Sequence, residues 1–177
     1  VINLFNNIGL EPIIAPEIEF YLVKKNNDPD YPLETPSGQS GRIEKGNQSY
    51  GIDAINEFDH IFEDLYDYCE AQDLDVENIN HEDGPAQMEI NFKHGNPLDL
   101  ADQVFLFKRT LRQTALKHNL YATFMAKPLE DSPGNSMHIH QSLLKKGKPV
   151  FVNKDLKTTS YFDRYLGGLQ KYSKSFL

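Results

Sequence analysis

The sequence predicts an α+β fold, with a largely antiparallel sheet and helices packed on one face of it. Several short segments alternate apolar and polar residues with the period of two that half-buried strands show. Residues 53–72 and 96–119 instead place apolar residues three or four positions apart, as amphipathic helices do. Strands and helices do not follow the strand–helix–strand rhythm of a parallel sheet, which favours the α+β class.

The first elements are the end of a helix, a strand and a long loop. Apolar residues before Gly9 predict a last helical turn that this glycine closes. Residues 16–23 alternate strictly, which predicts a strand with Glu17 and Glu19 on one face and apolar side chains on the other. Residues 24–50 are rich in Asn, Asp, Pro, Gly and Ser, and they predict one long surface loop.

A helix is expected next, with Asp53 as its N-cap and its end near Gln72. Cys69 lies on the apolar stripe of this helix, so we expect an inert core thiol rather than a catalytic one. The acidic residues of the helix predict a solvated face. They are Asp59, Glu63, Asp64 and Asp67.

Two short strands, over 74–82 and 86–92, lead into the helix with the clearest sequence signals. Asn96 is its expected N-cap, and Pro97 fits the first helical position because that residue needs no hydrogen-bonded N–H. Asn119 is the expected C-terminal stop.

The remaining residues predict two strands, a turn, another strand and a last helix. These are expected at 121–126, 137–144, 145–148, 149–152 and from about Thr159 onward. Gly167 and Gly168 lie within the last helix, which indicates close packing against a neighbour.

Composition excludes several classes of protein. The 177 residues carry a formal net charge of −8, which disfavours binding to the phosphate backbone of nucleic acids. One cysteine cannot form a disulfide within the chain, so a reducing, cytoplasmic compartment is expected. No apolar run approaches the ~20 residues that span a bilayer, so we expect no membrane contact. The chain starts without Met and stops inside a helical pattern, so we expect a piece of a longer chain.

Polar side chains gather on one face of three predicted strands. They are Glu17 and Glu19 in 16–23, Gln87, Glu89 and Asn91 in 86–92, and His138, His140 and Ser142 in 137–142. With Glu82 beside them, one surface would hold four carboxylates and two imidazoles. Packed carboxylates repel one another, and a divalent cation removes that conflict. Oxygen ligands with one imidazole favour Mg²⁺ or Mn²⁺ over structural zinc.

Other interpretations of the same motifs remain open. A Glu-x-Glu strand is often only a solvated face, and a His-x-His strand is often a hydrogen-bonded structural pair. A cupin-like metal oxidoreductase would bind one iron at His138 and His140, although no carboxylate follows within the next few positions. The glycine-rich phosphate loops and the Ser or Cys nucleophile signatures are absent from the sequence.

Six motifs, in order, resemble those of the glutamine synthetase family. They are APEIEFYL (15–22), YGID (50–53), VENINHED (76–83), GPAQMEINF (84–92), the segment 101–128, and PGNSMHIHQSL (133–143). The resemblance covers nearly the whole chain. It implies a single partial catalytic domain over residues 1–177, without the family's N-terminal β-grasp domain and without the C-terminal part of the catalytic domain.

The resemblance also implies two sites for Mg²⁺ or Mn²⁺. Glu19, Glu82 and Glu89 match the ligands of one metal, and Glu17 and His138 match ligands of the other. Glu19, Glu89 and His138 are the implied catalytic residues.

Further matches concern the substrates. Gly134 and His138 match positions that contact glutamate, whereas Glu77, His140 and Ser142 match positions on the nucleotide side. The implied reaction uses ATP to phosphorylate the γ-carboxylate of glutamate, after which ammonia or an amine attacks the γ-glutamyl phosphate. The full-length form is expected to be a homo-oligomer, and the chain alone is expected to be inactive.

Three departures from the ammonia-using enzymes favour the branch that joins glutamate to polyamines or methylamine. Glu82 and Glu89 are seven positions apart, one fewer than in those enzymes. Ala86 replaces a usual glycine, and Pro133 replaces a usual asparagine. The alternative from another class is a non-catalytic homologue that keeps the fold for a structural role.

Overall fold

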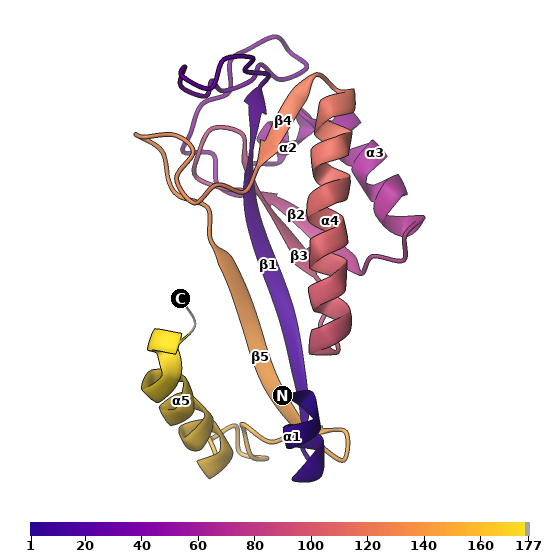
Figure 1. Cartoon of the computed structure of the whole chain (residues 1–177), viewed down its shortest axis with the longest axis vertical. Helices are drawn as coiled ribbons and strands as arrows, with labels where there is room; N and C mark the ends of the chain where they lie inside the picture. The colour runs from indigo at the N-terminus through magenta and orange to yellow at the C-terminus, as the bar shows by residue number, and fades with distance from the viewer. Residues whose placement is uncertain (176–177) are drawn as a thin grey trace.

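A six-stranded sheet is the framework of the structure, a computed structural model that describes residues 1–175 (Figure 1). Five strands lie in the order β2-β3-β1-β5-β6, and β4 pairs with the C-terminal end of β1. The strands are β1 (Glu11–Lys24), β2 (Val76–His81), β3 (Gln87–Phe92), β4 (Leu120–Thr123), β5 (Met137–Lys145) and β6 (Lys148–Pro149). Every strand pair in the described residues is antiparallel, which confirms the expected α+β class.

Helices α3 and α4 cover the same face of the sheet (Figure 1). The helices are α1 (Ile2–Asn7), α2 (Ile52–Asn56), α3 (Asp59–Glu70), α4 (Pro97–Lys117), α5 (Ser160–Tyr172) and the 3₁₀ turn η1 (Ser173–Ser175). Helix α5 lies beside β5, on the side away from α4 (Figure 1). No helix within residues 1–175 has both the length and the apolar character needed to cross a membrane.

The core lies between α3, α4 and the covered face of the sheet. The strands contribute Ile18, Phe20, Leu22, Met88 and Ile90, and the helices contribute Ile61, Leu65, Phe107 and Leu111. The rings of Phe92 and Phe107 meet edge to face, with centroids 5.4 Å apart. Cys69 is buried in this core, and burial raises the pKa of its thiol to about 11. The expectation that Cys69 lies in the core is therefore confirmed, and both its burial and its raised pKa disfavour reactivity.

Helix α4 forms as its sequence signals predict. The side chain of Asn96 accepts hydrogen bonds from the backbone N–H groups of Leu98 and Asp99, and Pro97 occupies the first turn. Asn119 has a left-handed φ of 63°, which ends the helix. The apolar stripe predicted for this helix is completely buried; it consists of Leu100, Val104, Phe107, Leu111 and Ala115.

The helix expected over 53–72 is instead two helices, α2 and α3, separated at Glu57 and Phe58. The loop before them causes the break. The backbone N–H of Gln39 donates to the carbonyl of Glu57 at 2.9 Å, so this carbonyl is bonded to the loop and not to the next helical turn. Asp53 lies inside α2, whose N-cap is Gly51, so the expected capping role of Asp53 is wrong.

Other predicted boundaries also shift. Strand β1 starts at Glu11 rather than at residue 16, because its first half pairs with β5. The strands expected at 121–126 and 149–152 shrink to β4 and β6. The expectation that Gly167 and Gly168 pack closely against a neighbour is wrong within the described residues. A Cβ added to either glycine would meet no atom within 4 Å.

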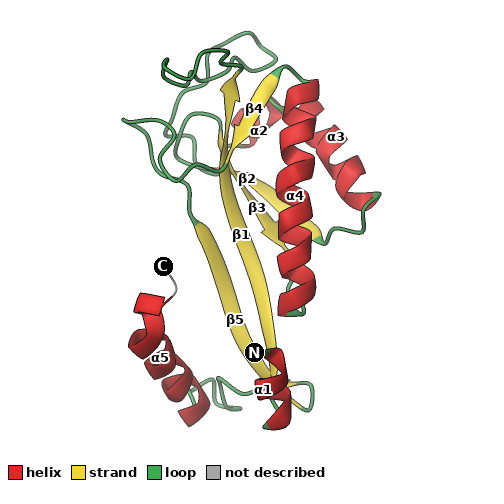
Figure 2. Cartoon of the chain, in the orientation of Figure 1, coloured by secondary structure: helices red, strands yellow, loops and turns green. Residues whose placement is uncertain are grey.

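Loops gather at the end of the sheet where β1 stops, as the green segments of Figure 2 show. Residues 25–51 contain no helix or strand beyond one bridge between Ser37 and Ile43, which confirms the long loop. Residues 124–136 form a second loop beside it, and the two loops line a common hollow. This end of the sheet therefore carries the most irregular backbone.

One member of the predicted acidic face, Asp64, joins α3 to the end of α4. Its carboxylate lies 2.9 Å from Nζ of Lys117 and 2.7 Å from Nε2 of His118. These hydrogen bonds hold the pKa of Asp64 below its usual value. The other three acidic residues of that face are exposed.

Replacing Asp64 by asparagine is expected to lower the thermal midpoint by ~1–3 °C at pH 7. A carboxyl with a lowered folded-state pKa stabilises the fold above its unfolded pKa of ~3.9, and this contribution disappears as pH falls through the folded pKa. The difference between the two midpoints should therefore shrink as pH falls through the folded-state pKa. Thermal melts followed by circular dichroism, with exposed Asp67→Asn as control, measure this. A difference that does not shrink as the pH is lowered would contradict the role of the ionised carboxylate.

Candidate metal centre and the loop beside it

Antiparallel pairing aligns polar side chains in rows across the face of the sheet that α3 and α4 leave open. In one row, Glu17 of β1 lies opposite Asn91 of β3 and His138 of β5. In the next row, Glu19 lies opposite Glu89. Side chains two apart on a strand share a face, so both rows point the same way. Strand register therefore brings together residues that are far apart in the sequence.

Glu17, Glu89 and His138 form a compact group of possible metal ligands. One ligand atom from each lies within 4.8 Å of the other two. Donors on opposite sides of one Mg²⁺ lie ~4.2 Å apart, because each Mg–O distance is ~2.1 Å. Small side-chain rotations would bring these ligand atoms to the distances needed to coordinate one ion. Two carboxylates and an imidazole, without a thiolate, fit Mg²⁺ or Mn²⁺.

Glu17 contacts both imidazoles of β5. Its carboxylate lies 3.5 Å from Nδ1 of His138 and 2.8 Å from Nε2 of His140. Both histidine side chains are largely exposed, whereas Glu17 is half-buried. His140 therefore lies beside the three-residue group and at the open side of the sheet.

Burial and mutual repulsion act on the carboxylates. The pKa of Glu82 is raised by burial, and then by the charges of Glu89 and Glu19. The pKa of Glu89 is raised by burial and by the charges of Glu17 and Glu19, while its hydrogen bond with Asn91 acts in the opposite direction. A bound divalent cation would offset this crowding of negative charge.

Glu19 is held by neighbours outside the group of Glu17, Glu89 and His138. Oε2 of Glu19 accepts from the backbone N–H of Ser136 at 3.0 Å and from Nε2 of Gln87 at 3.1 Å. The hydroxyl of Ser136 donates to Oε1. The implied division of ligands between two metals stays a prediction, because the group combines residues that were assigned to different metals.

Gly134 lies in the loop 124–136, which the sheet holds in place. A Cβ at Gly134 would lie 2.6 Å from the carbonyl oxygen of Ala126, so the loop folds back too closely for a larger residue. The hydroxyl of Tyr21 donates to the carbonyl of Pro133 at 2.7 Å. Burial, followed by the charge of Glu19, raises the pKa of Tyr21 to about 12, which keeps this donor protonated.

The expected nucleotide-side residues do not all lie together. His140 lies beside Glu17, as described above, and Ser142 follows it on the same face of β5, half-buried and opposite Ile13. Glu77 is exposed on β2, where the pairing register with β3 shifts. Their contact with a nucleotide stays a prediction.

Sequence reasoning assigned no role to Gln87, Ser136 or Tyr21, although each holds part of this site. The sequence showed only that Gln87 lies on the polar face of a predicted strand. That pattern does not distinguish a buried amide from an exposed one. Gln87 is 1% exposed. Nothing local in the sequence indicates that Ser136 reaches Glu19, which lies 117 positions earlier.

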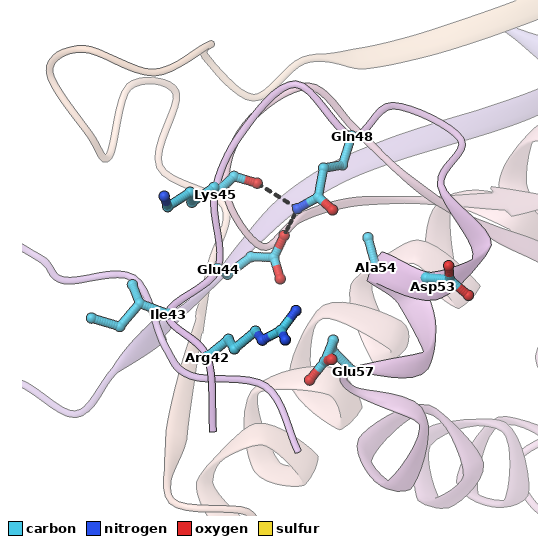
Figure 3. Close-up of a pocket in the computed structure, with 8 residues that line it drawn as sticks. All are labelled: Arg42, Ile43, Glu44, Lys45, Gln48, Asp53, Ala54 and Glu57. Carbon is cyan, nitrogen blue, oxygen red and sulfur yellow. Dashed lines mark hydrogen bonds between the residues drawn. The ribbon is translucent and has the colours of Figure 1, made fainter. Parts of the chain in front are cut away.

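A separate pocket of about 630 Å³ lies between the loop before α2 and α2 itself (Figure 3). Arg42, Glu44 and Glu57 are among its lining residues, and no residue of the candidate metal centre lines it. Glu44 also faces the buried His81, whose Nδ1 lies 2.6 Å from the carbonyl oxygen of Glu82. The pocket wall therefore supports the backbone that presents Glu82.

Comparison with protein families places the whole chain in one of them. The model of the family described as "Glutamine synthetase, catalytic domain" matches residues 1–177.

Curated relatives agree with this match. The chain is 37% identical over 169 residues to the glutamine synthetase of Pyrococcus horikoshii, covering 95% of this chain and 35% of the relative. It is 33% identical over 165 residues to the gamma-glutamylputrescine synthetase PuuA of Escherichia coli, covering 91% of this chain and 35% of the relative. The chain thus spans about a third of the length of these relatives.

Solved structures share the fold. The cryo-EM structure of Plasmodium falciparum glutamine synthetase superposes with a TM-score of 0.84 at 23% identity, covering 97% of this chain and 38% of that one. A GmaS/ADP complex superposes with a TM-score of 0.76 at 26% identity, covering 98% and 39%.

Proposed function

This chain belongs to the glutamine synthetase family, and on that premise we propose that it carries part of the active site of an ATP-dependent glutamate–amine ligase. In the proposed reaction, ATP phosphorylates the γ-carboxylate of glutamate, and ammonia or a primary amine displaces the phosphate to form an amide. Relatives named for amide and γ-glutamyl amine synthesis support the reaction class. A similar protein solved with ADP supports a nucleotide substrate.

The observation that carries the proposal is the group formed by Glu17, Glu89 and His138, whose ligand atoms lie within 4.8 Å. ATP and glutamate are anions, and the carboxylate face alone would repel both. A divalent cation held by these residues would polarise phosphate and carboxylate oxygens and reduce the repulsion. Mg²⁺ or Mn²⁺ is therefore the proposed cofactor.

The other site residues receive proposed roles from their places around this group. Glu19 and Glu82, together with Glu89, would hold a second cation. The backbone at Gly134 would contact glutamate. His140, Ser142 and Glu77 would lie on the nucleotide side. The full-length gene product is proposed to be a homo-oligomer, as the family resemblance implies.

A primary amine is the proposed acceptor in preference to ammonia. The short spacing from Glu82 to Glu89, together with Ala86 and Pro133, motivates this choice. In the structure, Ala86 is buried with a left-handed φ of 55°, a conformation that a glycine would adopt without strain. Pro133 presents its carbonyl to Tyr21. Pro133 lies in the loop that would contact glutamate, and Ala86 directly precedes Gln87, whose amide contacts that loop.

The acceptor is tested by glutamate-dependent ATP hydrolysis in the full-length gene product, with ammonium, methylamine, ethanolamine and putrescine assayed in parallel. The proposal predicts that kcat/KM for one amine exceeds that for ammonium by at least ~10-fold, which corresponds to ~1.4 kcal/mol of selectivity. A preference for ammonium would contradict the acceptor and leave the ligase class intact. Absence of turnover with every acceptor, despite cation binding, would favour the non-catalytic homologue.

A further inference from the structure

Gln87 joins three separate segments around Glu19. Its Nε2 lies 3.1 Å from Oε2 of Glu19 on β1, 3.0 Å from the carbonyl oxygen of Gly134 and 3.3 Å from Oδ1 of Asn135. Its Oε1 accepts from the backbone N–H of Gly84 at 3.0 Å, just after Glu82. One buried amide thus contacts Glu19, a carboxylate of the proposed second cation site, and both adjoining loops.

An uncharged amide supplies both kinds of contact. Its two N–H groups are shared among Glu19, Gly134 and Asn135, and its oxygen accepts from Gly84. A carboxylate at position 87 would have no donor and would bring another negative charge close to Glu19. A small apolar residue would leave buried polar groups unpaired, which is costly. The position therefore has a strict chemical requirement that packing alone does not impose.

Ser136 completes the arrangement from the loop side. Its N–H and its hydroxyl donate to the two oxygens of Glu19, and its carbonyl accepts from the N–H of Glu19 at 3.1 Å. Each carboxylate oxygen accepts about two hydrogen bonds. Oε2 is saturated by Ser136 and Gln87, whereas Oε1 keeps one free lone pair. Glu19 can thus offer one defined oxygen to a cation without releasing the loop.

We propose that Gln87 and Ser136 are positioning residues, which fix the carboxylate of Glu19 and the backbone of Gly134 in one arrangement and so couple cation binding to the order of the loop 133–136. Neither side chain touches the cation or the substrates. The proposal rests on the proposed function, because it takes Glu19 as a cation ligand. Such outer contacts orient ligand carboxylates and commonly change metal affinity by ~10–100-fold.

Cation binding and the order of the loop 133–136 should each favour the other. A cation held by Glu19 would fix the carboxylate in its present orientation, so that Oε2 stays in place for the N–H of Ser136. Reciprocity then requires that ordering of the loop raise the affinity for the cation by the same factor. Mn²⁺ should therefore slow hydrogen–deuterium exchange in residues 133–136.

The experiment measures Mn²⁺ affinity by calorimetry, and loop exchange by mass spectrometry, in the 177-residue chain. Ser136→Ala is expected to weaken Mn²⁺ binding ~10-fold. It should also remove most of the protection from hydrogen–deuterium exchange that Mn²⁺ gives the loop. Ser136→Thr keeps the hydroxyl and should restore both. Gln87→Met has a similar shape without the amide, and it should raise loop exchange even without Mn²⁺. Ser132→Ala is the matched control, because its hydroxyl makes no hydrogen bond among the described residues.

The outcomes separate this proposal from the proposed function. Unchanged Mn²⁺ affinity in Ser136→Ala and Gln87→Met, with normal binding by the unaltered chain, would overturn the positioning roles and leave the metal centre standing. An equal loss in Ser136→Ala and Ser136→Thr would overturn the role of the hydroxyl. Absence of Mn²⁺ binding in the unaltered chain would overturn the coupling together with the proposed metal centre.

Discussion

Replacing Glu89 by alanine is expected to lower kcat of the full-length gene product by ~10²–10³. Glu89 belongs to the group of possible ligands with Glu17 and His138, and its carboxylate lies among the charges of Glu17 and Glu19. Its loss would remove a proposed ligand of the cation that, in the proposed reaction, would offset charge between phosphate and carboxylate. Glutamate-dependent ATP hydrolysis at saturating substrates and Mn²⁺ measures the change.

The matched control for this prediction is Glu63→Ala. Glu63 is exposed on α3, in the helical layer that covers the opposite face of the sheet. Its removal changes the net charge by the same amount, without touching the candidate metal centre. Turnover by Glu89→Ala that equals turnover by Glu63→Ala would refute the proposed role of Glu89.

Replacing Phe107 by alanine is expected to lower the free energy of unfolding by ~3–5 kcal/mol, through lost burial and the cavity that remains. Phe107 is fully buried in α4, and its ring packs edge to face against Phe92 of β3. Urea unfolding followed by circular dichroism measures the loss. Phe107→Leu extends the series, with an intermediate loss, if the alanine variant does not fold.

Phe105→Ala is the control on the same helix. Phe105 is 74% exposed, so its removal should change the free energy of unfolding by less than ~0.5 kcal/mol. Equal losses in Phe105→Ala and Phe107→Ala would mean that α4 does not pack through the face described here.

Local signals sufficed where neighbouring residues determine the structure. Asn96 and Pro97 are adjacent to the turn that they cap, so the start of α4 could be predicted. Strict alternation put Glu17 and Glu19 on one face of β1, because a strand fixes side-chain direction at every residue. The α+β class followed from the mixture of these two periodicities.

Features that depend on hydrogen bonds between distant residues could not be predicted from local sequence patterns. The break between α2 and α3 depends on a bond from Gln39 to Glu57, 18 positions away. The burial of Gln87 depends on the loop 124–136, whose path no local pattern indicates. The polar motifs predicted which residues share a face on each strand. Only the strand register shows that Glu89 joins Glu17 and His138, while Glu19 turns to Ser136.

Calorimetric titration of the 177-residue chain with Mn²⁺ tests most directly whether Glu17, Glu89 and His138 hold a cation, because it needs no assumption about substrates. Mn²⁺ binding should be saturable, at least ~10-fold weaker in Glu89→Gln and unchanged in Glu63→Gln. Glutamine keeps the size of the side chain, so a loss would report on the charge and on the ligand oxygen. Absence of saturable binding, or equal affinity in Glu89→Gln and the unaltered chain, would contradict the metal centre at Glu17, Glu89 and His138.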